Sequence, residues 1–189
     1  MSEDKESAGP VVQLLTNGHY NVMVSSAGGG SSSRAGLAVT RWRDDATRDA
    51  SGTFCYVHDA DGGRVWSSTF QPTLACADAY DVAFTPGRAT VTRRDGDLEI
   101  ETVVAVAPLD DVELRRLRIR SHASAARVLT LTSCLEVVLG SAASDADHPA
   151  FEKLFVQTEV DPTTQTLLCT RRPRTPEEPR AWMFHAIVA

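Results

Sequence analysis

The stretch ATVTRRDGDLEIETVVAVA, residues 89–107, decides the fold class. Two β-forming runs flank the turn sequence at residues 94–97, which places Asp-Gly between them. Because glycine readily adopts the positive φ of a tight turn, the stretch predicts an antiparallel hairpin. One face of the second run is apolar, at Leu98, Ile100, Val104 and Val106. The other face begins with acidic residues, so we expect one face on the core and one in water.

Similar short runs continue along most of the chain. They are rich in Val, Thr, Leu and Phe, turn residues separate them, and residues 59–63 provide a second Asp-Gly hairpin. No segment has a convincing helical period. The predicted strands are residues 20–25, 37–42, 53–58, 80–84, 89–93, 98–107, 112–120 and 128–138. This spacing predicts an all-β protein, an antiparallel two-sheet sandwich.

Four segments predict particular local structures. In residues 112–120 the apolar residues change from even-numbered to odd-numbered positions, which predicts a β-bulge near Arg115 and Arg116. Residues 128–138 are apolar on both faces near their end, which predicts a central strand. The glycine-rich block 27–34 lacks the Gly-Lys-Ser/Thr ending of a phosphate-binding loop, so a structural loop or hairpin connection is expected. Residues 140–150 are also expected to form a loop.

Glu136 interrupts the apolar face of the predicted strand at residues 128–138. A partly buried carboxylate is costly unless it is paired or hydrogen-bonded, so an arginine or backbone partner is expected. Two roles remain open for this residue: an internal ion pair that joins two sheets, or contact with a sugar.

Length and composition indicate one ordinary globular domain. The chain has 189 residues, with 19 Lys and Arg against 25 Asp and Glu and therefore a net charge of −6. We expect residues 1–10 to form a flexible arm and residues 11–189 one β-sandwich domain. Residues 182–189 again have a strand-like pattern, and the sequence ends within it. The sandwich is therefore expected to be truncated at its C-terminus.

Several classes of function are disfavoured by the sequence. Neither a signal peptide nor a membrane-spanning run is recognised, so we expect a cytoplasmic location and no direct membrane contact. The acidic balance argues against nucleic-acid binding. The four cysteines are widely spaced and predict reduced thiols. Cys55 and His58 lack a second half of a zinc site, so neither a metal nor another cofactor is expected.

The segment TRWRDDATRD, residues 40–49, is a candidate for ligand contact. An indole ring can stack on the apolar face of a pyranose, while arginine and aspartate form bidentate hydrogen bonds with hydroxyl groups. A surface network of Arg–Asp ion pairs explains the same composition equally well. No G-x-S-x-G motif is present, and no pair of carboxylates can be selected as that of a glycosidase.

Six ordered blocks carry a resemblance to a known family. They are LLTNGHY (residues 14–20), LAVTRWRDDATRD (37–49), GTFCY (52–56), VWS (65–67), FQP (70–72) and HPAFEKLFV (148–156). Together they resemble the N-terminal domain of the glycoside phosphorylases formerly called glycosyltransferase family 36. Within that family, the phosphorylase-like part of cyclic β-1,2-glucan synthetase is the most similar. The resemblance covers about residues 13–189.

This resemblance implies a galactose-mutarotase-like β-supersandwich, which is followed in the family by an (α/α)6 barrel. The barrel carries the general-acid aspartate, and inorganic phosphate is the co-substrate of the full-length inverting enzymes. The chain alone is therefore expected to have no catalytic residues and no activity. The implied partners are a β-glucan oligosaccharide, the barrel and a second copy of the chain in a homodimer. Attachment of full-length relatives to the inner membrane is compatible with the resemblance.

The resemblance also selects candidate residues for substrate binding. They are Arg41, Trp42, Arg43, His148, Phe151 and Lys153. The same residues fit an interface between sandwich and barrel. Three hypotheses therefore remain: a carbohydrate-associated domain without catalysis, a purely architectural dimerisation or docking domain without sugar affinity, and a stand-alone phosphorylase or mutarotase-like enzyme. The last would need a histidine and a carboxylate on an open concave face, and the sequence identifies no such pair.

Overall fold

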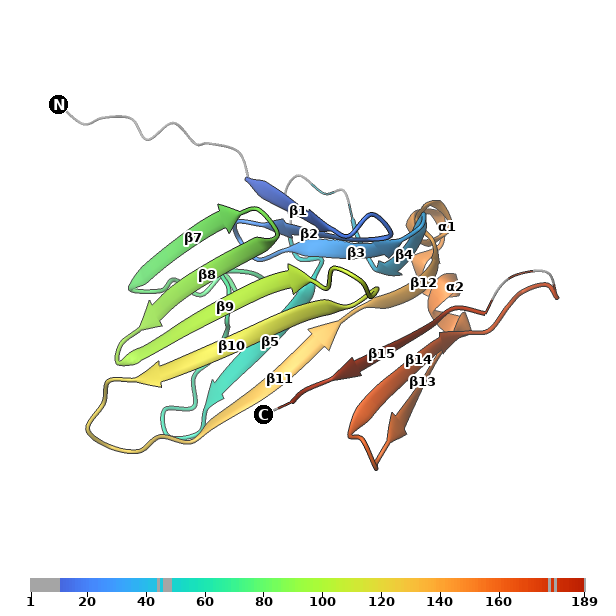
Figure 1. Ribbon diagram of the computed structural model, residues 1–189. Helices are drawn as coiled ribbons and strands as arrows, with labels where there is room; N and C mark the ends of the chain where they lie inside the picture. Colours follow the sequence, from blue (N-terminus) through green and yellow to red (C-terminus); the bar gives the residue numbers. More distant parts are fainter. Residues whose placement is uncertain (1–10, 44, 46–48, 177, 179, 189) are drawn as a thin grey trace.

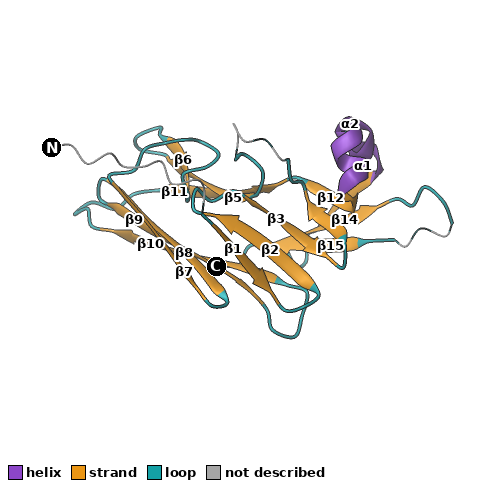
Figure 2. Cartoon of the chain, turned by 90° about the horizontal axis from the view of Figure 1, so that it is seen from above, coloured by secondary structure: helices purple, strands orange, loops and turns teal. Residues whose placement is uncertain are grey.

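The computed structural model describes residues 11–43, 45, 49–176, 178 and 180–188. Within these residues the chain forms antiparallel strands, two short α-helices and one 3-10 turn (Figure 1, Figure 2). The predicted all-β class is confirmed. The arm predicted at residues 1–10 lies outside the described residues. None of the described helices has the length and apolar character needed to cross a membrane.

The first layer of the sandwich contains two sheets. The larger has the order β1-β2-β3-β4-β12, with β1 (Val12–Thr16), β2 (Tyr20–Ser25), β3 (Gly30–Arg34), β4 (Leu37–Thr40) and β12 (Val137–Ser141). The smaller has the order β11-β5-β6, with β11 (Leu129–Leu135), β5 (Thr53–Asp59) and β6 (Val65–Ser67). Only Glu136 separates β11 from β12, so the chain passes directly from one sheet into the other (Figure 1).

The second layer also contains two sheets. One has the order β10-β9-β8-β7, with β10 (Glu113–Ser121), β9 (Leu98–Val106), β8 (Arg88–Asp95) and β7 (Ala79–Thr85). The other has the order β13-β14-β15, with β13 (Val156–Asp161), β14 (Thr166–Arg171) and β15 (Trp182–Ala186). β10 is therefore an outer strand of the first of these sheets, and β15 is an outer strand of the second.

Two buried apolar clusters join the layers. The first combines side chains of the five-stranded sheet with side chains of both second-layer sheets: Leu15, Tyr20, Val22, Val24, Val39, Ala89, Val104, Leu139 and Cys169. The second joins β5 and β6 to β9, through Val57, Trp66, Leu98 and Ile100. Burial of apolar surface contributes about 25 cal/mol per Å². Because both clusters lie between the layers, the predicted two-layer sandwich is confirmed. Each layer consists of two sheets.

Both predicted Asp-Gly hairpins are present. Residues 59–63 form the connection from β5 towards β6, and Gly96 with φ +60° turns the chain from β8 into β9. Leu98, Ile100 and Val104 of β9 are buried, as the alternation in the sequence predicts.

The predicted β-bulge near Arg115 and Arg116 is wrong. β10 pairs with β9 in one continuous register along its whole length. The inward positions at the start of β10 hold charged groups, because Arg115 pairs with Glu113 and donates to the carbonyl oxygen of Thr53 at 2.8 Å. Since these charged groups satisfy one another, no bulge is needed, and Leu114 lies on the outer face with 57% of its surface exposed.

Of three other local predictions, two need correction and one is confirmed. Residues 128–138 form two outer strands, β11 and β12, because the chain changes sheets at Glu136. The glycine-rich block 27–34 provides the expected hairpin connection, because β2 and β3 pair antiparallel and Ser25 N–H donates to the carbonyl oxygen of Gly29 at 2.8 Å across the turn. Residues 140–150 contain the end of β12 and helical turns instead of an extended loop.

Candidate functional site

Two short helices lie at the end of the five-stranded sheet (Figure 1). α1 (Ala142–Asp147) and α2 (Pro149–Glu152) lead into the 3-10 turn η1 (Lys153–Phe155). Proline suits the start of α2 because its missing N–H would have no helical acceptor there. Helices of this length are not stable alone, so contacts with the sheet must hold them. We call residues 41–43 together with residues 142–155 the helical corner.

Arg41 links the end of β4 to α1. Its Nε and Nη2 donate to the two carboxylate oxygens of Asp145 at 2.8 and 2.6 Å. Nη1 donates to Glu136 Oε2 at 3.1 Å, and Nη2 also donates to the carbonyl oxygen of Pro149 at 3.3 Å. The side chains of Arg41 and Asp145 are only 1% and 6% exposed. This buried bidentate pair therefore fixes α1 against the sheet.

Glu136 connects Arg41 to the start of η1. Its second carboxylate oxygen, Oε1, accepts a hydrogen bond from Lys153 Nζ at 3.3 Å. Partial burial raises the pKa of Glu136, but the hydrogen bonds and positive charges of Lys153 and Arg41 outweigh it and lower the pKa below its ordinary value. The partner expected for Glu136 is confirmed, although its side chain remains 51% exposed.

A second buried carboxylate, that of Glu152, holds α2. Its side chain is 2% exposed and accepts a hydrogen bond from Ser144 Oγ at 2.7 Å. Nη2 of Arg171, on β14, lies 2.5 Å from Glu152 Oε2, and Arg174 forms a further ion pair with the same carboxylate. Because a buried carboxylate is strongly destabilising without such partners, these contacts anchor α2 to the second layer.

Aromatic rings and guanidinium groups cover the outside of α2. The rings of Phe151 and Phe155 meet edge to face, with centroids 5.2 Å apart. The guanidinium of Arg174 lies 5.3 and 5.0 Å from these two centroids, and those of Arg171 and Arg172 lie 5.2 and 5.4 Å from that of Phe155. Cation–π contacts of this kind are attractive. Phe151 nevertheless keeps half of its surface exposed.

The six predicted substrate-binding residues all lie in the helical corner, in different environments. Arg41 is buried, and its guanidinium is engaged by Asp145 and Glu136. Lys153 joins the same group of charges through Glu136. The exposed members of the set are Trp42, Arg43, His148, Phe151 and Lys153. The corner therefore combines one buried arginine with five side chains that reach solvent.

Sequence reasoning missed most of the framework of this corner. Its members are Asp145, Glu152, Arg171 and Arg174. Asp145 is one of several carboxylates that the sequence could not rank. Arg171 and Arg174 belong to the proline-containing segment RRPRTPEEP, residues 171–179, which gave no local signal. The partners are far apart along the chain, as with Arg41 and Asp145, which are separated by 104 residues. Only the tertiary fold brings them together.

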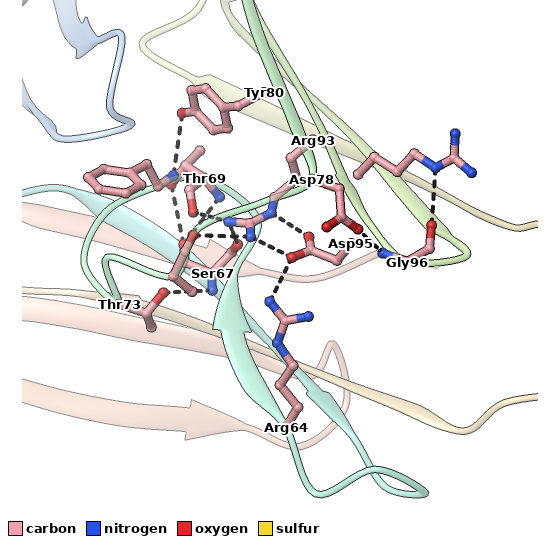
Figure 3. Close-up of polar contacts among 12 residues, drawn as sticks. Arg64, Ser67, Thr69, Thr73, Asp78, Tyr80, Arg93, Asp95 and Gly96 are labelled. Carbon is pink, nitrogen blue, oxygen red and sulfur yellow. Dashed lines mark hydrogen bonds and ion pairs between the residues drawn. The ribbon is translucent and has the colours of Figure 1, made fainter.

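A separate buried network links β8 to the loop after β6 (Figure 3). Arg93 Nε and Nη2 donate to Asp95 at 2.7 and 2.8 Å. The remaining donors reach the carbonyl oxygens of Ser67, Thr69 and Ala75 at 2.8, 2.7 and 3.4 Å. All five N–H groups of Arg93 thus have acceptors. This arginine stabilises the loop and has no free donor for a ligand.

A comparison with protein families identifies the family of this chain. The family model described as "Glycosyl hydrolase 94, supersandwich domain" matches residues 1–189. The chain is a glycosyl hydrolase 94 supersandwich domain. The resemblance to glycoside phosphorylases drawn from the sequence blocks is confirmed.

This glycosyl hydrolase 94 domain is also similar to a curated protein. It is 32% identical over 187 residues to the cyclic beta-(1,2)-glucan synthase NdvB of Rhizobium meliloti (strain 1021). The alignment covers 99% of this chain and 6% of the length of that relative. The similarity therefore concerns one small part of a much longer protein.

Proposed function

We propose that this chain is a non-catalytic, carbohydrate-associated domain of a β-glucan phosphorylase or cyclic β-1,2-glucan synthase-type enzyme. Its partners are then the (α/α)6 barrel of the same enzyme and a β-glucan oligosaccharide, with inorganic phosphate as the co-substrate used at the barrel. The name of the relative supports the substrate class. The family assignment supports the role of the domain within a larger enzyme.

The observation that carries the proposal is the construction of the helical corner. Buried arginine–carboxylate pairs hold it in place, while two aromatic side chains, Trp42 and Phe151, remain 40% and 50% exposed. An aromatic face can stack on a pyranose, and the exposed imidazole of His148 and ammonium of Lys153 can bind hydroxyl groups. Arg41 is a positioning residue in this proposal, because its guanidinium is already occupied by Asp145.

Calorimetric titration of the chain with β-1,2-gluco-oligosaccharides tests the proposal. We expect saturable binding that Trp42→Ala weakens about tenfold, or about 1.4 kcal/mol, as is common when an aromatic contact is truncated. Trp182→Ala is the matched control, because Trp182 is an exposed tryptophan on β15, outside the helical corner. Equal affinity of both variants and the unaltered chain would exclude the corner as the sugar-binding surface.

A second candidate function is supported by the burial of Arg41. If the corner serves only as a docking surface for the barrel or for a second copy, its arginines stabilise the domain and no sugar binds. Absence of binding at all oligosaccharide lengths, together with a dimer in sedimentation equilibrium that Phe151→Ala dissociates, would favour this architectural function.

A further inference from the structure

A cleft lies outside the helical corner, between β11 of the first layer and the sheet β13-β14-β15 of the second. Ser133, Gln165, Leu167, His185 and Ile187 line it. Its volume is about 480 Å³, within the range of about 300 to 1,000 Å³ of small-molecule sites. Figure 1 shows the end of β15 beside β11, and Ser133 on β11 contacts His185 on β15.

The polar groups of this cleft are uncharged. Ser133 Oγ lies 2.6 Å from His185 Nε2, so hydroxyl and imidazole form a hydrogen bond across the two layers. Burial lowers the pKa of His185, and the imidazole is therefore neutral at pH 7. Its charged neighbours, Glu113 and Arg115 on β10, act on this pKa in opposite directions and pair with each other at 2.5 Å.

The lining selects a class of ligand. A hydroxyl, a carboxamide and a neutral imidazole together offer both donors and acceptors. Leu167 and Ile187 provide an apolar surface beside them. A charged ligand would find no side chain of opposite charge in this lining, in which Ser133 and His185 are half-buried and Gln165, Leu167 and Ile187 are exposed. A small neutral ligand with several hydroxyl groups satisfies the polar groups and covers the apolar ones.

We propose that the cleft between β11 and β15 binds a small neutral polyol, with a monosaccharide as the best fit. Ser133, Gln165 and His185 supply the hydrogen bonds. This site is separate from the helical corner, since its lining residues lie on β11, on or just before β14, and on or just after β15. It stands whether or not the corner binds an oligosaccharide.

Nuclear magnetic resonance of the isotopically labelled chain tests the site, with glucose as probe and inorganic phosphate as the charged comparison. We expect saturable shifts of the Gln165 carboxamide and the His185 imidazole with glucose and no such shifts with phosphate. Because one hydrogen bond is lost, Gln165→Asn should raise the dissociation constant at least about fivefold. Asparagine tolerates the positive φ of +53° at this position.

Two further variants complete the test. Ser133→Ala should weaken glucose binding to a similar extent without altering the turn at Gln165, and Gln157→Asn, on exposed β13, should leave it unchanged. The proposal is overturned if glucose produces no saturable shifts in the cleft, if phosphate produces equal shifts, or if neither cleft variant weakens binding. Shifts confined to Trp42 and Phe151 would also overturn it while supporting the role of the helical corner.

Discussion

Replacing Arg41 by methionine removes the cation that faces the buried carboxylate of Asp145. Asp145 would lose both hydrogen bonds that it accepts from the guanidinium, at 2.8 and 2.6 Å, in a position where its side chain is 6% exposed. Removing one partner of a buried pair typically costs 3 to 5 kcal/mol, so we expect Arg41→Met to lower the free energy of unfolding by about 3 to 5 kcal/mol. Urea unfolding followed by circular dichroism measures this change.

Two comparisons make the result decisive. The double variant Arg41→Met, Asp145→Leu removes both charges, and we expect it to recover most of the loss, because apolar replacements of a buried pair are often nearly neutral. Arg43→Met, at an exposed position, should change stability by no more than about 0.5 kcal/mol. A loss below about 1 kcal/mol in Arg41→Met, or a double variant as unstable as the single one, would refute a structural role for this pair.

Further predictions concern stability, pH and catalysis. Arg93→Met should cost about 3 to 5 kcal/mol in urea unfolding, because buried Asp95 keeps only its ion pair with Arg64 and three carbonyl oxygens of the loop lose the donor that Arg93 provides. Because the pKa of Glu136 is lowered, its ionised carboxylate stabilises the folded state at pH values above the ordinary pKa of 4.5. This contribution to the free energy of unfolding is lost as the pH falls through the lowered pKa. Glu136→Gln should remove this part of the pH dependence of stability. Ala35→Asn should raise the unfolding free energy by about 0.5 to 1 kcal/mol, because residue 35 has φ +46°; an unchanged melting temperature would contradict this. Incubation with β-1,2-gluco-oligosaccharides and phosphate should release no glucose 1-phosphate.

The predictable part of the fold is the part with local signals. Strict alternation and an Asp-Gly turn located β8, β9 and their hairpin, and the predicted strand at residues 20–25 matches β2. Alternation failed where charged side chains point inward. Glu113 and Arg115 point inward and pair with each other, so the apolar Leu114 between them lies on the outer face. Reading Leu114 as an inward residue suggested a bulge that does not exist. A rule based on apolar residues alone cannot detect such a pair.

The candidate site was predictable only at its surface. Composition marked residues 40–49, the family resemblance selected residues 41–43 and 148–153, and the need for a partner at Glu136 followed from the cost of burying a carboxylate. The sequence could not reveal that Asp145 would bury Arg41, or that Arg171 and Arg174 would meet Glu152. These pairs join distant segments, and their geometry depends on how the two layers pack.

Mapping the binding of a β-1,2-gluco-oligosaccharide onto the isotopically labelled chain tests the central claim most directly. The account predicts saturable chemical-shift changes at Trp42, His148, Phe151 and Lys153, whose side chains are exposed in the helical corner. Arg41 and Asp145 should keep their mutual contact at saturation. Shift changes that leave the helical corner unaffected, or no saturable change at any residue, would contradict it.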